Sequence, residues 1–108
     1  MSEREARIAQ NEASSREINE GIENARPASP GDHVRMVCEC GRPDCSSLIA
    51  ITIQEYEAVR ADPRTFVVHH SHVSPDVEEP VRMDERFVVV RKREGIPAAI
   101  AEQEDPRS

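Results

Sequence analysis

The sequence predicts an α+β fold, in which a long N-terminal helix precedes a small, mostly antiparallel sheet with one packed helix and a cysteine-bearing loop. Residues 2–25 contain no proline and are rich in Glu, Arg and Ala, a composition that favours helix. Later in the chain, short runs of Val and Ile separated by turn residues are typical of strands. A capping motif between two of these runs marks a short helix within the strand region. These three observations together indicate the fold class.

The predicted N-terminal helix, residues 1–25, carries few apolar side chains. Ile8, Ile18 and Ile22 are the largest of them, and they form only a narrow stripe. Glu12 and Arg16 stand four residues apart, so we expect them to form a weak supporting ion pair on the helix surface. A helix that buries so little is marginal alone. We therefore expect a loosely packed, solvated helix, with a docking or dimerisation surface as the alternative.

The chain leaves this helix through a predicted linker over residues 26–33, where two prolines and a glycine cannot continue a helix. A domain over residues 34–92 is expected to follow. Its first two strands are predicted at residues 34–38 and 48–51. Thr52 and Glu55 then form a capping box, which predicts a helix from residue 53 to about residue 61.

Three more strands complete the predicted domain. Residues 66–69 form one, and residues 81–83 and 87–91 form a hairpin. The last of these strands contains three consecutive valines without alternation, so we expect it to be central and covered on both faces. Residues 93–108 are mostly charged and contain two prolines. They are expected to be a flexible tail, in which residues 98–102 form at most a short helix.

Composition restricts the classes of function. The net charge is −7 at pH 7 and aromatic residues make up 3% of the chain, which argues against nucleic-acid binding because that needs clustered positive charge. The basic run at residues 91–93 is short, so we interpret it as a solvated strand end. No apolar run approaches the ~20 residues that cross a bilayer. The chain also begins without an apolar export signal, so the sequence predicts a soluble, cytoplasmic protein without membrane contact.

Three cysteines within eight residues are the densest chemical feature of the chain. Cys38 and Cys40 form a Cys-x-Cys pair that places two thiolates on one side of a bent segment. Gly41 and Pro43 then turn the chain, so that Cys45 can reach the same point. A structural zinc site takes four sulfur or nitrogen ligands at ~2.0–2.3 Å. The motif therefore predicts a structural Zn²⁺ site that needs one more ligand.

A histidine is the expected fourth ligand. His69, His70 and His72 follow the apolar run at residues 66–68, where a strand could end beside the cysteine loop. His33 precedes the loop by five residues and is the weaker candidate. We favour His72 and keep the other three as alternatives.

Free or redox-active thiols are the main alternative to a metal site. Three cysteines cannot all pair, and a disulfide between Cys38 and Cys40 would be strained at so short a separation. A bridge from Cys40 to Cys45 suits a secreted protein, which the absence of an apolar export signal argues against. Zinc is therefore the favoured interpretation.

Two resemblances bear on this loop. Locally, the C-x-C-x4-C spacing is similar to the small zinc loop that follows the catalytic domain of many lysine methyltransferases, although no catalytic domain accompanies it here. Over residues 7–92, the order of several short segments resembles a group of small uncharacterised bacterial proteins with a CEC-x4-C segment. The segments that carry this resemblance are residues 11–13, 16–20, 37–40, 56–60, 66–68 and 87–90, with Cys45 and His72.

In that group, a single histidine follows the Phe-Val-Val strand in a Pro-Gly-His context. Here His70 and Ser71 replace the Pro-Gly pair, which leaves His72 at the equivalent place. The resemblance therefore implies that His72 completes the site, while the departure from the group's pattern adds two competing ligands. No activity is established for this group, so the resemblance implies none for this chain.

Two classes of function fit these observations. The favoured one is a zinc-stabilised protein-interaction or regulatory module whose partner is another protein, with self-association through the N-terminal helix as an alternative. The other is a small zinc-dependent enzyme, in which a spare histidine or Glu39 acts as general base towards a zinc-bound water. Three thiolates weaken the Lewis acidity of the metal, and the chain shows no paired catalytic groups. The interaction module is therefore favoured.

Overall fold

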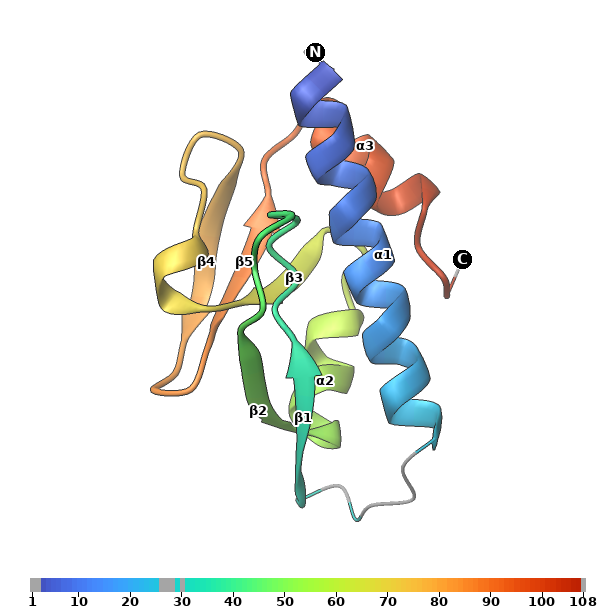
Figure 1. Ribbon diagram of the computed structural model, residues 1–108, viewed down its shortest axis with the longest axis vertical. Helices are drawn as coiled ribbons and strands as arrows, with labels where there is room; N and C mark the ends of the chain where they lie inside the picture. Colours follow the sequence, from blue (N-terminus) through green and yellow to red (C-terminus); the bar gives the residue numbers. More distant parts are fainter. Residues whose placement is uncertain (1–2, 26–28, 30, 108) are drawn as a thin grey trace.

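The structure, a computed structural model, describes residues 3–25, 29 and 31–107 (Figure 1). Its α+β architecture confirms the predicted class, with a long N-terminal helix, antiparallel strands and a packed helix between them. The elements in chain order are α1 (Glu3–Ala25), β1 (His33–Val37), β2 (Leu48–Thr52), α2 (Ile53–Arg60), β3 (Thr65–Val68), the 3-10 turn η1 (His70–His72), β4 (Glu78–Met83), β5 (Val88–Lys92) and α3 (Ile96–Gln103).

The strands form two small sheets rather than one. In the first, β1 pairs antiparallel with β2, and the register places Val34 opposite Ile51 and Met36 opposite Ile49. These four side chains alternate with exposed ones and are buried. The second sheet has the order β3-β5-β4, with both pairs antiparallel. Side chains from both sheets and from α2 meet in one core, so the two sheets belong to one folded unit.

Strand β5 is central in its sheet, as its three consecutive valines predicted. All three are buried. Strand β4 lies at the edge and begins at Glu78, earlier than the sequence suggested. It accommodates Pro80 because an edge strand need not donate every backbone N–H, and its register to β5 is irregular between Pro80 and Arg82.

The capping box that starts α2 is confirmed. The Thr52 hydroxyl accepts a hydrogen bond from the Glu55 backbone N–H at 3.0 Å, and the Glu55 carboxylate accepts one from the Thr52 backbone N–H at 2.8 Å. The helix ends at Arg60, three residues before Pro63. It buries Tyr56 and Val59 against the sheets.

Helix α1 differs from the expected loosely packed helix. Ala9, Glu12, Arg16 and Asn19 are buried at spacings of three or four residues, which is the pattern of one helix face, while Ile18 is 54% exposed. The buried face is therefore largely polar. It packs because each polar side chain finds a partner elsewhere in the fold, so the surface ion pair expected between Glu12 and Arg16 is replaced by separate buried interactions.

Arg16 shows how this polar face is stabilised. Its guanidinium donates hydrogen bonds to the backbone carbonyls of Pro63 and Thr65, both at 2.8 Å, and to that of Ala101 at 3.2 Å. It also lies 3.8 Å from the centre of the Phe66 ring, a cation–π geometry. One side chain of α1 thus connects three segments that are distant in sequence.

Lys92 is likewise buried and not a solvated strand end. Its ammonium group forms ion pairs with Glu12 of α1 and with Glu78 of β4, the latter at 2.5 Å. Burial alone would lower the pKa of Lys92, but the two carboxylates outweigh burial and raise it. Burial raises the pKa of Glu12 to about 7, although Lys92 opposes this shift.

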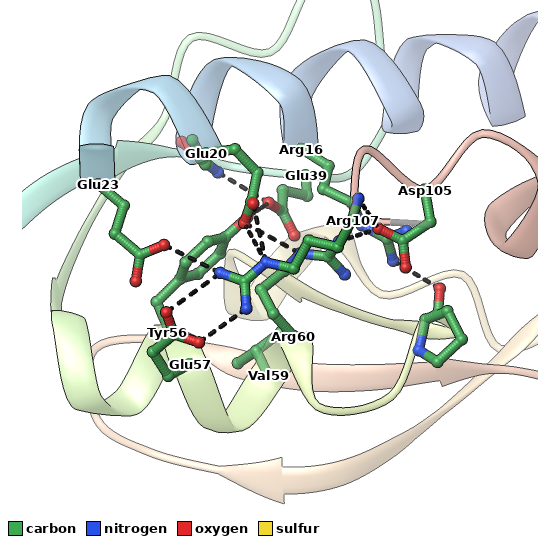
Figure 2. Close-up of polar contacts among 12 residues, drawn as sticks. Arg16, Glu20, Glu23, Glu39, Tyr56, Glu57, Val59, Arg60, Asp105 and Arg107 are labelled. Carbon is green, nitrogen blue, oxygen red and sulfur yellow. Dashed lines mark hydrogen bonds and ion pairs between the residues drawn. The ribbon is translucent and has the colours of Figure 1, made fainter. Parts of the chain in front are cut away.

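The C-terminal segment is packed where the sequence suggested a flexible tail. Helix α3 lies against α1, and Ala98 and Ala101 are buried there. Figure 2 shows Arg107 beyond α3, where its guanidinium donates to carboxylates on α1 and α2 at 2.7–2.9 Å. These carboxylates belong to Glu20, Glu23 and Glu57.

Two further predictions from the sequence concern the linker and membrane-spanning segments. Half of the predicted linker over residues 26–33, namely residues 26–28 and 30, lies outside the described residues. Within the described ranges, no helix has both the length and the apolar character to cross a membrane.

Candidate metal centre

The structure brings three cysteines and one histidine together at the end of β1. The Sγ atoms of Cys38, Cys40 and Cys45 and one ring nitrogen of His72 all lie within 4.8 Å of one another. These are the residues that the sequence favoured as ligands, drawn from a loop and a 3-10 turn that are 27 or more residues apart. All three cysteines are free of disulfides. The chain therefore holds a Cys3His cluster with the donor set of a metal site.

The spacing within the cluster suits a tetrahedral ion. Nδ1 of His72 lies 3.6 Å from Sγ of Cys38 and 3.4 Å from Sγ of Cys45. Zinc bonds of about 2.3 Å to sulfur and about 2.0–2.1 Å to nitrogen give a tetrahedral edge of about 3.6 Å. The side chains can thus receive an ion of this size with little rearrangement.

Backbone hydrogen bonds shape the cysteine loop. The Cys38 backbone N–H donates to the Ser47 carbonyl at 3.1 Å, which extends the β1-β2 pairing beyond β1. The Cys45 backbone N–H donates to the Arg42 carbonyl at 3.2 Å and closes a turn. Between them, Gly41 has a φ of +75°, a left-handed conformation that glycine adopts without strain. The loop thereby folds back and places Cys45 beside Cys38.

Gly41 also allows the loop to touch α1. A Cβ atom at this position would lie 2.6 Å from Cγ of Glu12 and 2.6 Å from the Ile8 carbonyl oxygen. Asn11 donates a side-chain hydrogen bond to the Gly41 carbonyl at 3.1 Å. The predicted role of Gly41 in turning the loop is accompanied by a second, which is close approach to the helix.

The turn η1 presents His72. Its backbone N–H donates to the His69 carbonyl at 2.9 Å. The His69 ring accepts from the Ser71 backbone N–H at 3.2 Å and caps the turn. The backbone N–H of His69 also donates to Sγ of Cys38 at 3.1 Å, a hydrogen bond that supports a thiolate.

The other histidines lie outside the cluster. His69 serves as the cap of η1, and Nε2 of His70 lies 2.6 Å from the Asp84 carbonyl oxygen. His33 is exposed on β1, opposite Thr52 of β2. Among the described residues, His72 is the one histidine grouped with the three cysteines.

One of the three thiols, that of Cys40, is poised for ligation. A hydrogen bond from Cys38 lowers the pKa of Cys40 to about 5, and the backbone N–H of Arg42 adds to this effect against the opposing influence of burial. The same hydrogen bond, with burial, raises the pKa of Cys38. The thiolate is the form that binds metal, so Cys40 is charged at neutral pH before any ion arrives.

Glu39 stands between two of these cysteines but points into the protein. Its carboxylate is fully buried and accepts hydrogen bonds from Asn19 at 2.9 Å, the Tyr56 hydroxyl at 2.8 Å and the Val67 backbone N–H at 3.0 Å. Figure 2 shows the carboxylate enclosed between α1 and Tyr56 of α2. Burial raises its pKa, while these donors oppose the shift. These hydrogen bonds all lie inside the protein, so the carboxylate is held as a structural group.

Glu39 also connects the two sheets. Its backbone N–H donates to the Val67 carbonyl at 2.8 Å, while its side chain accepts from the Val67 backbone N–H. Glu39 thereby provides hydrogen-bond partners for both the N–H and the carbonyl of Val67, on the edge of β3 that does not pair with β5. This role of Glu39 and the supporting positions of Asn11 and Asn19 were not predicted from the sequence. The available signal was a polar residue at every third or fourth position of an apolar-poor helix.

No family model matches the chain, and no curated protein or solved structure matches it. The geometry and chemistry of the cluster therefore carry the functional argument.

Proposed function

We propose that the protein is a zinc-stabilised interaction module, in which Cys38, Cys40, Cys45 and His72 bind one structural Zn²⁺. The observation that carries the proposal is the convergence of three sulfurs and one ring nitrogen at tetrahedral spacing. A donor set of three thiolates and one imidazole suits zinc better than it suits hard cations such as magnesium or calcium.

The position of the cluster supports a stabilising role. Cys38 and Cys40 follow a strand of the first sheet, and His72 follows β3 of the second. An ion bound by all four residues links the ends of both sheets. In a chain of 108 residues with a small core, such a link contributes strongly to stability.

The enzymatic alternative gains no support from the groups that it needs. Four protein donors close a tetrahedral site and leave no position for a reactive water. The Glu39 carboxylate is fully buried and accepts hydrogen bonds from three donors, and the His69 ring caps η1. His70 lies beside the Asp84 carbonyl. We therefore favour a structural ion.

For the interaction surface, we favour edge strand β4 over helix α1. The buried face of α1 is committed to its own domain through Arg16 and Asn19. On β4, Val81 is 51% exposed and Met83 is 71% exposed, and the strand lies at the edge of its sheet. Exposed apolar side chains on an edge strand are suited to pairing with a strand of another protein.

Cobalt substitution tests the metal site. Co²⁺ bound by three thiolates and one imidazole gives intense visible absorption typical of tetrahedral coordination, together with sulfur charge-transfer bands. We expect His72→Ala to weaken Co²⁺ binding and alter these bands. His70→Ala is the matched control because it removes an exposed ring from the same turn. Unchanged Co²⁺ affinity and spectrum in His72→Ala would rule out His72 as a ligand.

The interaction surface requires a separate test. We expect the double variant Val81→Asp with Met83→Asp to lose crosslinking to a partner that the parent protein captures, while its Co²⁺ spectrum stays unchanged. The control is Ile18→Asp, which places one added negative charge at an exposed apolar position on α1. If only the control variant Ile18→Asp failed to capture the partner, the interaction surface would lie on α1 instead of β4.

A further inference from the structure

A cavity of about 730 Å³ lies between the first half of α1 and the cysteine loop. Ile8 of α1 and Pro43 of the loop line it with apolar surface, and Cys40 of the metal cluster also faces it. Cavities of 300–1,000 Å³ with a mixed lining are typical of small-molecule sites. This cavity is large enough for an organic ligand and lies next to one of the proposed zinc ligands.

The cavity is lined by two arginines that, unlike most arginines of the described residues, have no partner. Arg7 and Arg42 both line it, and the side chain of neither forms an ion pair or hydrogen bond with the residues that the structure describes. Among the arginines whose side chains are described, Arg35 is the only other one without such a contact. The remaining arginines are engaged by carboxylates or, for Arg16, by backbone carbonyls.

Of the three uncommitted arginines among the described side chains, two thus lie at one cavity in a protein of net charge −7. Asp44 and the Cys40 thiolate also line the cavity and contribute negative charge, which the two guanidinium groups balance. Asn11 lies in the same lining, but its amide N–H is already committed to the Gly41 carbonyl. Ser74 also lines the cavity and adds a neutral hydroxyl, so the charged donors are the two guanidinium groups.

We propose that this cavity binds a small organic carboxylate, with its acid group between Arg7 and Arg42 and its apolar body against Ile8 and Pro43. Guanidinium groups bind carboxylates through charge-assisted, often bidentate hydrogen bonds. The apolar walls favour a ligand with a hydrocarbon portion over a simple inorganic anion. The proposal depends on the cavity and its charges, and it holds whether or not the neighbouring ion is zinc.

Titration with octanoate, followed by ¹⁵N NMR of the full chain, tests the proposal. We expect saturable shifts centred on Arg7, Ile8 and Arg42. The double variant Arg7→Ala with Arg42→Ala should bind octanoate at least about ten-fold more weakly, because it loses the charge-assisted hydrogen bonds. Arg35→Ala is the matched control, since it removes the remaining uncommitted arginine without altering the cavity lining, and it should bind as the parent does.

Two further probes separate the parts of the ligand. 1-Octanol has the apolar body without the acid group, and inorganic phosphate is an anion without an apolar body. Both should bind more weakly than octanoate. Equal binding of either probe would overturn the proposal, as would the absence of saturable shifts with octanoate or equal octanoate affinity in the double variant. Metal content and NMR dispersion of the double variant show whether its fold is intact.

Discussion

Asn19 of α1 pairs with the backbone of Val37 in both directions, as a neighbouring strand would. Its side-chain oxygen accepts from the Val37 N–H at 2.8 Å, and its side-chain nitrogen donates to the Val37 carbonyl at 2.9 Å. Val37 immediately precedes the first cysteine of the cluster. The N-terminal helix therefore fixes the backbone from which the proposed metal site begins.

This relationship predicts that Asn19→Ala destabilises the protein. The substitution leaves the N–H and carbonyl of Val37 without their side-chain partner, and it also removes a hydrogen bond to Glu39. Unsatisfied buried polar groups cost about 1–3 kcal/mol each. We expect the free energy of unfolding, measured with urea, to fall by at least about 2 kcal/mol.

Asn24→Ala supplies the control, because Asn24 is exposed on the same helix. Its stability should stay within about 0.5 kcal/mol of the parent. Equal stability of the two variants would mean that the paired amide of Asn19 contributes nothing to the fold.

The cysteine loop leads to a second prediction, at Gly41. Alanine there must adopt a left-handed conformation, which costs roughly 1–2 kcal/mol, and its Cβ would meet Glu12 and the Ile8 carbonyl at 2.6 Å. We expect Gly41→Ala to lower both the melting temperature and the metal affinity. Gly31→Ala is the comparison, since a Cβ at Gly31 meets nothing within 4 Å. A Gly41 variant as stable as the Gly31 variant would contradict the close packing of loop and helix.

The buried ion pairs of Lys92 lead to a third prediction, about pH. Burial raises the pKa of Glu12 to about 7 from a usual value of 4.5, so the folded state holds a proton that the unfolded state releases. The contribution of Glu12 to stability is therefore fully present below about pH 4.5 and is lost as pH rises through 7. Over this interval the loss is on the order of 3 kcal/mol.

Glu12→Gln isolates this contribution because glutamine does not titrate. Between pH 4.5 and 7, the unfolding free energy of the variant should rise relative to that of the parent, measured by urea unfolding at each pH. Glu17→Gln, at an exposed position of α1, should show no such trend. A constant difference between parent and Glu12→Gln would show that Glu12 keeps its ordinary pKa in the fold.

Local signals were sufficient to predict much of the fold. The capping box of Thr52 and Glu55 lies within four residues. The unbroken run of three valines in β5 by itself predicts a strand that is buried on both faces. The cysteine spacing likewise indicated three members of the cluster. Its histidine was favoured by position and by resemblance, and the structure places His72 beside the sulfurs.

Long-range polar pairing could not be predicted in this way. Glu12 meets Lys92 across 80 residues, and Arg16 meets Ala101 across 85. Hydrophobic periodicity identifies a buried helix face only when that face is apolar, whereas the buried face of α1 is largely charged or amide-bearing. For the same reason, nothing near Lys92 in the sequence indicated its burial, and α3 gave little sign that it would cover α1.

Native mass spectrometry of the chain, purified without added metal, tests the central claim most directly. One zinc ion binds per folded chain if the four residues form the proposed site, and the ion is lost when Cys38 and Cys45 are both replaced by serine. The same sample under denaturing conditions should have the mass of the fully reduced chain. A compact, folded chain that carries no metal, or one that contains a disulfide among the three cysteines, would contradict the account.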